Sequence, residues 1–580
     1  MKLKVISQYH PAACLHNPRL WADMLTDWEH LPTEVPHDFK IVPKGFIDAS
    51  EYSMDTENTP AGKLGDWSVA FRNPKGELCV MPFTGANPHM MFGGTCVMHQ
   101  AKWDIRVLQA AGMTPPTNVH DTMIAAYCLG LGKQAPKDST KSQSGSEMVG
   151  GLGLKYLARR HLGMQMKTWS EVYNRPELVP EYNANDSVAT YLLWEKWKPQ
   201  LPQHYWDIDM PLLPVLMAIE DRGIQVDPSF LKEYAARLDE ELAKFDLPFN
   251  PFATQEVQSY VYGTLGIEPW RFTDTGAPST DADVLETIDD LVVKDLLRYK
   301  GLYQERNTYA KGYMKGLDYQ GRLHTELKQT STATGRLSSA NPNLQNVIKE
   351  GSDLRKLFIA PEGMKLIRLD YDQLEWRVLA AITQDPILLK ALASGKKIHQ
   401  VTAEQMNIPY DKAKKGNFAI QYGAKAWTLA QNLECTIEEA KQFMVLYFKK
   451  FPGVKKYQDQ QREIANSEKK VTNYFGRVRR LDAMFAQDWR IRQEGEKEAI
   501  NTPIQGAAGE VVKLAMIELH KHNANMLLQV HDELLFEVPE KEAKDYAQWL
   551  QEYVPTITSI NGVSFPVEVC VGDTWHECCK

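Results

Sequence analysis

The chain has 580 residues, of which 43% are hydrophobic and 24% charged, and its formal net charge is −8 at pH 7. This length is too great for one core and predicts about three or four domains or subdomains of ordinary globular composition. No apolar run approaches the ~18 residues of a membrane span, and the N-terminus lacks an apolar core long enough for a signal peptide, so we expect no membrane span and a cytoplasmic location. The eight scattered cysteines are expected to be free thiols.

Three stretches indicate how the first 200 residues are organised. The stretch from His10 to Pro18 resembles a DNA-contacting loop of uracil-DNA glycosylases, but the chain has no room for the rest of that fold. We therefore expect residues 1–35 to be an N-terminal extension without activity. Residues 133–151 are rich in serine, glycine and lysine and predict a flexible loop. Residues 198–202, which contain two prolines, predict a domain boundary.

Acidic residues recur in the first 200 residues at spacings that could gather them. Asp55 and Glu57 follow each other at i and i+2 in a predicted strand, so both face one side, where like charges repel unless a cation lies between them. A solvated edge strand explains the pair equally well. Asp104 enters a predicted amphipathic helix, and Tyr182 and Asp186 lie one turn apart on another. Taken singly, such a Tyr–Asp pair is usually a surface feature.

Helices are expected to dominate from about residue 210 to 326, for example over Pro228 to Asp246 and Asp281 to Tyr299. The polar segment from Thr332 to Asn346 follows. Its glycine, hydroxyl and amide residues permit close approach to phosphates and groove edges, although a plain loop has the same composition.

The stretch from Lys365 to Thr383 changes its hydrophobic period from that of a strand to that of a helix. Asp370 and Asp372 therefore lie where a strand ends, and helix capping is the alternative explanation. A second acidic group, His531 to Glu533, lies between two apolar runs at the predicted tip of a hairpin, where ordinary turn chemistry is the alternative. Carboxylates on neighbouring strand ends could hold two Mg²⁺ ions about 3.5–4 Å apart.

Two further stretches contain candidate binding residues. Lys414, Phe418 and Tyr422 are spaced i, i+4 and i+8, so they share one helical face, although an amphipathic helix with a solvated lysine has the same pattern. The segment from Asn501 to Gly506 predicts the start of a helix, with Thr502 as N-cap, Pro503 at the first position and Gln505 as the capping-box partner. Basic clusters near residues 448–456 and 469–480 predict phosphate contacts or solvated faces.

The stretches LDYDQLEWR (369–377) and VHDE (530–533) resemble motifs A and C of the family A DNA polymerases, and TATGRLSS with NPNLQN (332–346) resembles their template–primer motif. The resemblance covers roughly residues 45 to 580. It implies that Asp370, Asp532 and the backbone carbonyl of Tyr371 are metal ligands. It implies nucleotide-binding residues: Lys414 on the triphosphate, Phe418 against the sugar, Tyr422 under the nascent base pair, Glu375 as the gate against a ribose 2′-hydroxyl, His399 and Gln373. The implied DNA-binding residues are Arg336, Gln345, Asn501, Gln505, His531 and Lys497.

Asp55, Glu57, Asp104, Asp186 and Tyr182 together resemble the site of the DEDD-type 3′–5′ exonucleases that contain a tyrosine. The resemblance implies that the four acids bind two metal ions and that Tyr182 orients the attacking water. The chain departs from these families at three positions: Gln100 replaces a frequent Asn, Tyr410 a usual Arg, and Lys497 an Arg. Asp121 also fits the exonuclease pattern and is expected to be structural.

The resemblance implies a multidomain α/β and α+β fold. Expected are an RNase H-like exonuclease domain over 36–200 and a right-hand polymerase domain over 201–580, with the thumb at about 201–335, the palm at about 336–395 and 480–580, and the fingers at about 396–479. The length of the chain predicts no preceding 5′-nuclease domain.

The function expected is that of a template-directed DNA polymerase with catalytic residues Asp370, Asp532 and Lys414 and with proofreading through Tyr182. It would use two Mg²⁺ ions in each site, with Mn²⁺ as a substitute. Expected partners are template–primer DNA, dNTPs and replisome proteins such as a helicase or processivity factor. A monomer is expected, acting in phage DNA replication in the host cytoplasm. The alternatives are a single-subunit RNA polymerase, which Glu375 and the nuclease motifs disfavour, and a non-catalytic DNA-binding scaffold, which would need no acidic constellation.

Overall fold

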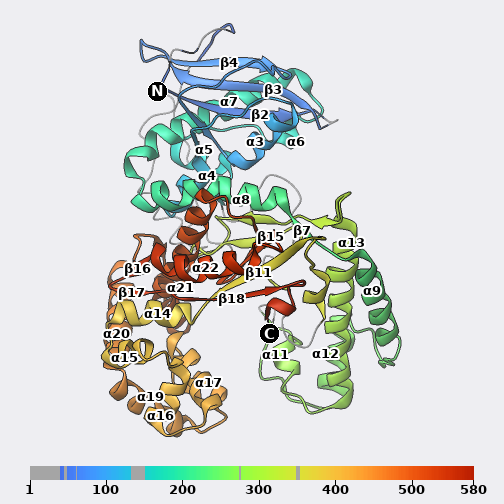
Figure 1. Cartoon of the computed structure of the whole chain (residues 1–580), viewed down its shortest axis with the longest axis vertical. Helices are drawn as coiled ribbons and strands as arrows, with labels where there is room; N and C mark the ends of the chain where they lie inside the picture. The colour runs from blue at the N-terminus through green and yellow to red at the C-terminus, as the bar shows by residue number, and fades with distance from the viewer. Residues whose placement is uncertain are drawn as a thin grey trace.

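The computed structural model describes residues 39–44, 47, 49–59, 62–131, 151–273, 276–347 and 353–579. The expected extension 1–35 and all but the last residue of the expected loop 133–151 lie outside these ranges. Figure 1 shows an N-terminal body at the top, a central sheet below it, and two helical arms that extend from the region of that sheet. The mixed α/β multidomain architecture expected from the sequence is confirmed. Within the described residues, no helix has the length and apolar character needed to cross a membrane.

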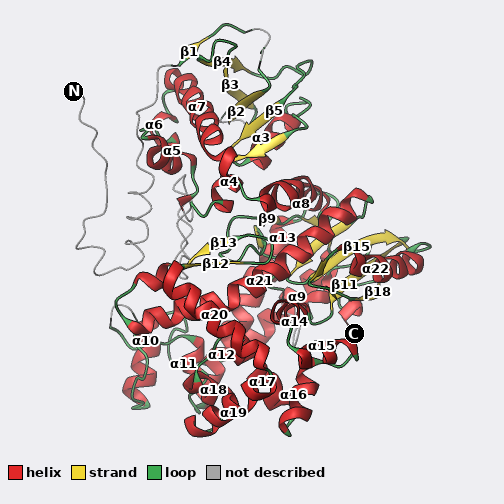
Figure 2. Cartoon of the chain, turned by 90° about the vertical axis from the view of Figure 1, so that its left-hand side faces the viewer, coloured by secondary structure: helices red, strands yellow, loops and turns green. Residues whose placement is uncertain are grey.

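The N-terminal body is built on a six-stranded mixed sheet in the order β1-β4-β3-β2-β5-β6. Helix α7 packs on its central strands, where Ser53 Oγ of β2 donates to the carbonyl of Ser187 at 2.6 Å, and Figure 2 shows α7 lying along one side of the sheet. The strands and helices of this body are β1 Lys40–Ile41, β2 Glu51–Asn58, β3 Leu64–Arg72, β4 Leu78–Thr84, β5 Thr95–Met98, α3 Ala101–Ala110, β6 Val119–Asp121, α4 Thr122–Cys128, α5 Leu154–Leu162, α6 Trp169–Val172, η2 Pro176–Leu178, α7 Val179–Trp197 and η3 Lys198–Gln200.

The central sheet is four-stranded and antiparallel, in the order β14-β15-β11-β18. Alternation along β11 buries Ile367 and Leu369 in the core that includes α14 and α21. Leu366 points to the opposite face, where it joins a cluster with Phe358 and Trp575. The elements of this region are β11 Met364–Tyr371, α14 Leu374–Thr383, α21 Trp489–Lys521, β14 Met526–Val530, β15 Glu533–Pro539, α22 Ala543–Ile557, β16 Ser559–Ile560, β17 Val563–Ser564, β18 Val567–Gly572 and η9 Glu577–Cys579.

The segment before the central sheet begins with two linker helices (residues 205–222). The first arm follows and is formed by the helices between residues 228 and 316 (Figure 1). The elements of the whole segment are η4 Tyr205–Asp209, α8 Met210–Arg222, β7 Ile224–Gln225, α9 Pro228–Leu242, α10 Thr254–Gln258, η5 Ser259–Thr264, α11 Ala282–Leu285, α12 Leu291–Gln304, η6 Glu305–Lys311, α13 Gly312–Gly316, β8 Arg322–Leu323, β9 Glu326–Lys328, β10 Ser338–Ala340 and η7 Leu354–Leu357. The helix expected over 281–299 is two helices, because the Asp290 side chain caps α12 by accepting from Val293 N at 3.0 Å.

The second arm is inserted between α14 and α21 and is almost wholly helical. Its elements are α15 Pro386–Ala393, α16 Ile398–Met406, α17 Tyr410–Gln421, α18 Ala426–Leu433, α19 Ile437–Lys450, α20 Pro452–Glu468, β12 Lys470–Thr472, β13 Val478–Arg480 and η8 Asp482–Phe485.

The prediction that a helix begins at residues 501–506 was wrong. Helix α21 begins at Trp489, where the Asp488 side chain caps it by accepting from Arg490 N at 2.8 Å. Pro503 lies inside this helix, and Thr502 Oγ1 accepts from Arg479 Nη1 at 2.7 Å instead of capping. Burial of the helix on both sides of the proline outweighs the local cap signal, as tertiary packing often does.

A buried ionic network joins the N-terminal body to the rest of the chain. Arg477, between β12 and β13, donates to both carboxylate oxygens of Asp209 at 2.8 Å and also pairs with Glu510 of α21. Its guanidinium lies 5.4 Å from the ring centre of Tyr127 on α4. The side chains of Asp209 and Glu510 are 0% exposed, so the arginine replaces water as their partner.

We expect Arg477→Met to lower the free energy of unfolding by about 3–5 kcal/mol, because it leaves two buried carboxylates without their main partner. Urea unfolding followed by tryptophan fluorescence would measure the change. The control is Arg490→Met, which removes an exposed arginine of α21 and should shift stability by no more than about 0.5 kcal/mol. Equal midpoints for the two variants would show that the network does not stabilise the fold.

Candidate active sites

The first candidate site is a cluster of acids in the N-terminal body. Strand β2 contributes Asp55 and Glu57, helix α7 contributes Asp186, and one oxygen of each lies within 4.8 Å of the others. Asp104, from α3, accepts from the backbone N–H of Thr56 at 3.1 Å and from its hydroxyl at 2.6 Å, so it is bound to the same strand just beside this group. The four acids expected from the sequence therefore come from three elements that meet at β2.

Burial raises the pKa of all four acids, and the neighbouring acids raise that of Asp55 and Glu57 further. Burial first, and then the charge of Asp186, raise the pKa of Asp55 well above its usual value and that of Glu57 to about 8. Burial raises the pKa of Asp104 to about 7 and that of Asp186 to about 6. Carboxylates that are brought together against their repulsion favour a cation between them, and hard oxygen donors fit a divalent ion such as Mg²⁺.

Tyr182 and two residues that the sequence analysis did not identify complete this site. Tyr182 lies one turn before Asp186 on α7, where burial and the charge of Asp186 raise the pKa of its hydroxyl. Asn183 Nδ2 donates to Asp55 Oδ2 at 2.7 Å and to its carbonyl at 3.0 Å. Lys155, from α5, pairs with Asp186 and lies 4.1 Å from the ring centre of Tyr182. The adjacency of Asn183 to Tyr182 was a usable signal, whereas a helical lysine is normally expected in solvent.

Asp121, expected to be structural, has that role. One of its oxygens accepts from Met123 N at 2.7 Å and caps α4, and the other accepts from Ala101 N at 2.7 Å at the start of α3. It thereby fixes the helix that carries Asp104.

The second candidate site lies at the end of the central sheet. Asp370, near the end of β11, is directly opposite Glu533 on β15. Asp532 is in the two-residue turn between β14 and β15, and its carbonyl accepts from Tyr371 N at 3.3 Å. His531, the other turn residue, has φ 55°, as tight hairpin turns require. The turn therefore brings Asp370 and Asp532 to neighbouring strand ends, where burial raises the pKa of Asp532.

Arginines hold the acids around this second site. Arg368 pairs with Asp370, and its Nε donates to Glu533 at 2.7 Å. Glu533 also accepts from Arg355 Nη1 at 3.0 Å. Asp372 is turned toward Arg377 Nη2 at 2.6 Å, so this second strand-end acid belongs to a different ion pair. Asp370 and Asp532, which the sequence analysis expected to bind metal, lie at neighbouring strand ends of this sheet.

Glu375 connects three segments that lie far apart in the sequence. Its two oxygens accept from Arg336 Nη2 at 2.5 Å and from Gln421 Nε2 at 2.7 Å. The Tyr422 hydroxyl donates to Glu375 at 3.3 Å. Tyr422 and Glu375 were expected at the nucleotide site and Arg336 at the DNA, and the structure brings the three side chains together. Gln421 was not expected.

Helix α17 presents Lys414 and Phe418 to solvent. The ring of Phe418 lies 6.4 Å from that of Tyr422 and 5.1 Å from that of His399. Burial, with the charges of Lys414 and Lys397, lowers the pKa of His399 to about 4. His399 Nδ1 accepts a hydrogen bond from the side-chain amide of Asn417 on α17 at 3.0 Å. The expected helical face is therefore present beside a neutral imidazole.

The other predicted contact residues surround the same region. Gln373, with φ 51°, accepts from Ile398 N at 2.8 Å and so links α14 to α16. Gln345 Nε2 donates to Gln529 Oε1 at 2.8 Å. On α21, Lys497 pairs with Glu494 at 2.8 Å, while Asn501 Oδ1 is buried without a partner among the described residues.

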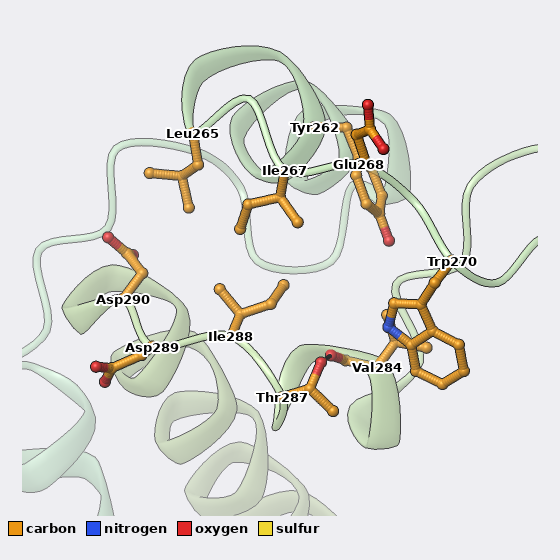
Figure 3. A pocket seen from close by; sticks show the side chains of 10 residues that line it. All are labelled: Tyr262, Leu265, Ile267, Glu268, Trp270, Val284, Thr287, Ile288, Asp289 and Asp290. Carbon is orange, nitrogen blue, oxygen red and sulfur yellow. Dashed lines mark hydrogen bonds between the residues drawn. The ribbon is translucent and has the colours of Figure 1, made fainter.

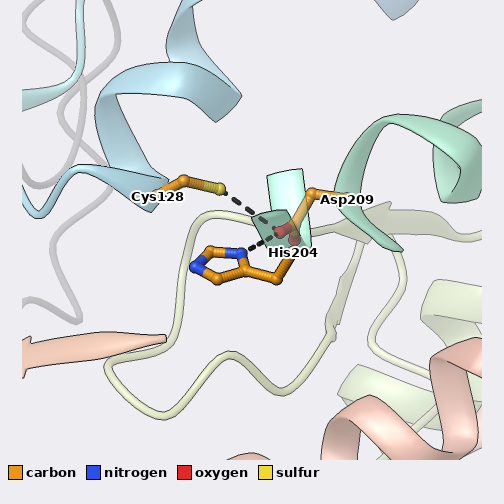
Figure 4. Close-up of side chains that lie close together, drawn as sticks. All are labelled: Cys128, His204 and Asp209. Carbon is orange, nitrogen blue, oxygen red and sulfur yellow. Dashed lines mark hydrogen bonds and ion pairs between the residues drawn. The ribbon is translucent and has the colours of Figure 1, made fainter. Parts of the chain in front are cut away.

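Cys128, His204 and Asp209 form a further set of possible metal ligands (Figure 4). His204 Nδ1 lies 2.8 Å from Asp209 Oδ2, and Cys128 Sγ donates to the same oxygen at 3.3 Å. Burial would raise the pKa of Asp209, but the charges of Arg477 and Lys513 outweigh it and lower that pKa. Two cationic side chains already neutralise this carboxylate, so the group does not fit a metal ion.

Comparison with known proteins follows the same division of the chain. The family model described as "DNA polymerase family A" matches residues 228–577. The chain belongs to DNA polymerase family A. The model described as "3'-5' exonuclease" matches residues 89–202, which include Asp104, Tyr182 and Asp186.

The relatives of this family A chain include bacterial enzymes. It is 33% identical over 527 residues to the DNA polymerase I of Chloroflexus aurantiacus. This match covers 83% of this chain and 54% of that protein. It is 35% identical over 399 residues to the thermostable DNA polymerase I of Thermus aquaticus. This match covers 64% of this chain and 48% of that protein. The chain thus spans about half the length of the curated relatives it matches.

A solved structure also resembles the chain: the polymerase domain of Pol1 from M. smegmatis, described in complex with a DNA primer-template and dNTP. Its TM-score is 0.78 at 25% sequence identity, and the match covers 92% of this chain and 97% of that one.

One hollow of this family A chain lies apart from both candidate sites. It has a volume of about 370 Å³ and is formed by residues of the first arm (Figure 3). Leu265 and Ile288 contribute apolar surface, and Asp289 and Asp290 lie at its edge. None of the residues that the sequence analysis singled out lines it.

Proposed function

We propose that the chain is a template-directed DNA polymerase that extends a primer with dNTPs and removes mispaired 3′ ends at a separate nuclease site. The observation that supports this most is the gathering of acids into two separate clusters, one on the central sheet and one on the N-terminal sheet, in a chain that belongs to family A. A DNA-binding scaffold would need neither cluster.

At the polymerase site, Asp370, Asp532 and the carbonyl of Tyr371 would hold two Mg²⁺ ions, with Mn²⁺ as a substitute. Bound divalent ions supply stabilisation of the attacking 3′-oxygen and of the leaving pyrophosphate oxygen. Arg368 fixes Asp370 and the neighbouring Glu533 in place. Lys414, exposed on α17, neutralises charge on the triphosphate.

The residues around Glu375 form the proposed nucleotide site. Phe418 lies against the sugar, Tyr422 lies under the nascent base pair, and Glu375 occupies the space of a ribose 2′-hydroxyl. His399 and Gln373 complete this site. The proposed DNA contacts come from the 332–346 segment, α21 and the β14–β15 turn: Arg336, Gln345, Asn501, Gln505, Lys497 and His531.

At the nuclease site, Asp55, Glu57, Asp104 and Asp186 would hold two further ions. The Tyr182 hydroxyl, one turn from Asp186 on α7, orients the attacking water. A mispaired primer end frays more readily than a paired one, so it reaches this site as a single strand.

The finer assignments belong to the same proposal. Residues 36–200 form the nuclease domain, and residues 201–580 form the polymerase domain with thumb (about 201–335), palm (about 336–395 and 480–580) and fingers (about 396–479). The first and second arms of the structure correspond to the thumb and fingers. We further propose action as a monomer in the cytoplasm during phage DNA replication, together with replisome proteins.

Extension of a labelled primer on a template by the purified chain tests the proposal. Each dNTP is supplied alone and together, and then each rNTP. Template-directed addition of dNTPs is the expected result. Extension that prefers rNTPs would instead indicate an RNA polymerase, and DNA binding without extension would indicate a scaffold.

Glu375→Ala is expected to lower the preference for dNTPs over rNTPs by about 10- to 100-fold, because it removes the side chain that would occupy the space of the 2′-hydroxyl. The ratio of kcat/KM for dCTP and CTP opposite template G measures the effect. Glu568→Ala, a change of an exposed acid on β18 of the same sheet, is the control and should leave that ratio unchanged. An unchanged ratio for Glu375→Ala would remove the gate from the proposal.

A further inference from the structure

Lys155 is a basic side chain inside the nuclease cluster whose role is not explained by the four acids and the tyrosine. It stands in the first turn of α5, and its ammonium pairs with Asp186 while lying 4.1 Å from the ring centre of Tyr182. Its side chain is 22% exposed. Among the described residues, Lys155 is the basic side chain whose charge acts on Asp55, Glu57 and Asp186 together.

The fold fixes the point from which Lys155 reaches the cluster. His99, at the end of β5, lies with Nε2 3.0 Å from the carbonyl of Leu152 and with Nδ1 2.9 Å from the Thr122 hydroxyl. Burial keeps this histidine neutral by lowering its pKa to about 3. The start of α5 is thereby bound to the elements that carry Asp104 and Asp121.

The contacts of Lys155 place it in competition with a metal ion. Asp186 is one of the three acids whose oxygens lie within 4.8 Å of one another, so the ammonium shares a carboxylate with the ion that this group would hold. A lysine has a compact charge on a flexible stem, and it can leave the carboxylate for a nearby anion without moving the backbone. The anion that enters a nuclease site is a DNA phosphate.

We propose that Lys155 is a positioning residue of the nuclease site, which holds Asp186 and Tyr182 while the site is free of metal and turns to the phosphate of the DNA 3′ end when metal and DNA bind. This inference rests on the proposed nuclease function. Lys155 thus has two partners in turn. The first is the Asp186 carboxylate, on which a metal ion replaces the lysine, and the second is a phosphate of the DNA substrate.

The test measures metal binding apart from activity. Mn²⁺ is titrated by calorimetry into the full chain with the background Asp370→Asn and Asp532→Asn, so that the nuclease site gives the signal. Lys155→Met is expected to lower the Kd for Mn²⁺ by about fivefold, because the competing ammonium is gone. Lys155→Arg should retain most of the competition. Arg159→Met, which removes the same charge from the exposed face of α5, should leave the Kd unchanged.

Trimming of a labelled single strand is measured on the same variants with the wild-type polymerase residues. Lys155→Met should trim at least about tenfold more slowly at saturating Mn²⁺, because the phosphate contact is lost. An unchanged or higher Kd for Mn²⁺ in Lys155→Met would overturn the inference, as would full trimming activity. If the wild-type chain binds Mn²⁺ but does not trim, the proposed nuclease function fails, while the Mn²⁺ titration still decides the competition.

Discussion

Asp370→Asn is expected to reduce primer extension by about a thousandfold or more and to leave 3′ trimming unchanged. The substitution keeps the shape of the side chain but removes the charge that a divalent ion needs at the end of β11, and the loss of such a ligand costs several kcal/mol of transition-state stabilisation. Because Asp370 lies on a central strand between β15 and β18, its backbone should stay in place. Single-turnover extension of a labelled primer measures the effect.

Asp372→Asn is the matched control for this prediction. Asp372 follows the same strand two residues after Asp370, and its carboxylate pairs with Arg377. We expect the extension rate of Asp372→Asn to fall by no more than about tenfold from the wild-type rate, because the substitution weakens only one structural ion pair. If Asp370→Asn still extends at the wild-type rate, the polymerase site is elsewhere. If both variants lose extension equally, the strand end itself is disturbed.

The sequence predicted the elements that carry the acids, because hydrophobic periodicity is a local property. The change of period after Leu369 predicted the end of β11 and the start of α14, and the apolar runs around Asp532 predicted the β14–β15 hairpin. The same local reasoning was wrong at Thr502 and Pro503. There a good cap signal lies in the middle of α21, and packing of the whole helix decides the outcome.

The residues that sequence reasoning missed are basic or amide side chains with distant partners. Arg477 meets Asp209 across 268 positions of sequence, and Lys155 meets Asp186 across 31. A lysine or arginine in a helix or loop is normally solvated, so nothing in its own neighbourhood predicts a buried carboxylate as its partner. The sequence identified the acids of the two candidate sites because those acids fall into motifs. It did not identify the basic side chains that pair with buried acids, because these fall into no motif.

Residues 332–336 contact both the N-terminal body and the proposed nucleotide site. The Tyr127 hydroxyl on α4 donates to the carbonyl of Thr332 at 2.7 Å, and Arg336 pairs with Glu375 at the proposed nucleotide site. Between them, Gly335 lies so close to Arg477 that a Cβ there would stand 2.7 Å from Arg477 Nε. The segment is therefore held by α4 of the N-terminal body at one end and by α14 at the other.

Asp55→Ala is expected to abolish 3′ trimming, by about a thousandfold or more, and to leave primer extension at the wild-type rate. Alanine removes a proposed metal ligand from the cluster on β2 and also the acceptor of Asn183 Nδ2. The loss of a ligand at a two-metal site costs several kcal/mol of transition-state stabilisation, whereas the central sheet shares no residue with this cluster. Release of a labelled 3′ nucleotide from a single strand and from a mispaired primer measures trimming.

The control for Asp55→Ala is Asp66→Ala. It removes the same charge from a half-buried position on the neighbouring strand β3, where the carboxylate accepts from the Thr84 hydroxyl at 2.9 Å. It should trim at the wild-type rate. Extension by the same Asp55→Ala preparation shows that the polymerase part of the chain is folded. Trimming that survives in Asp55→Ala would mean that the acids on β2 do not form the nuclease site, whatever the outcome at Asp370.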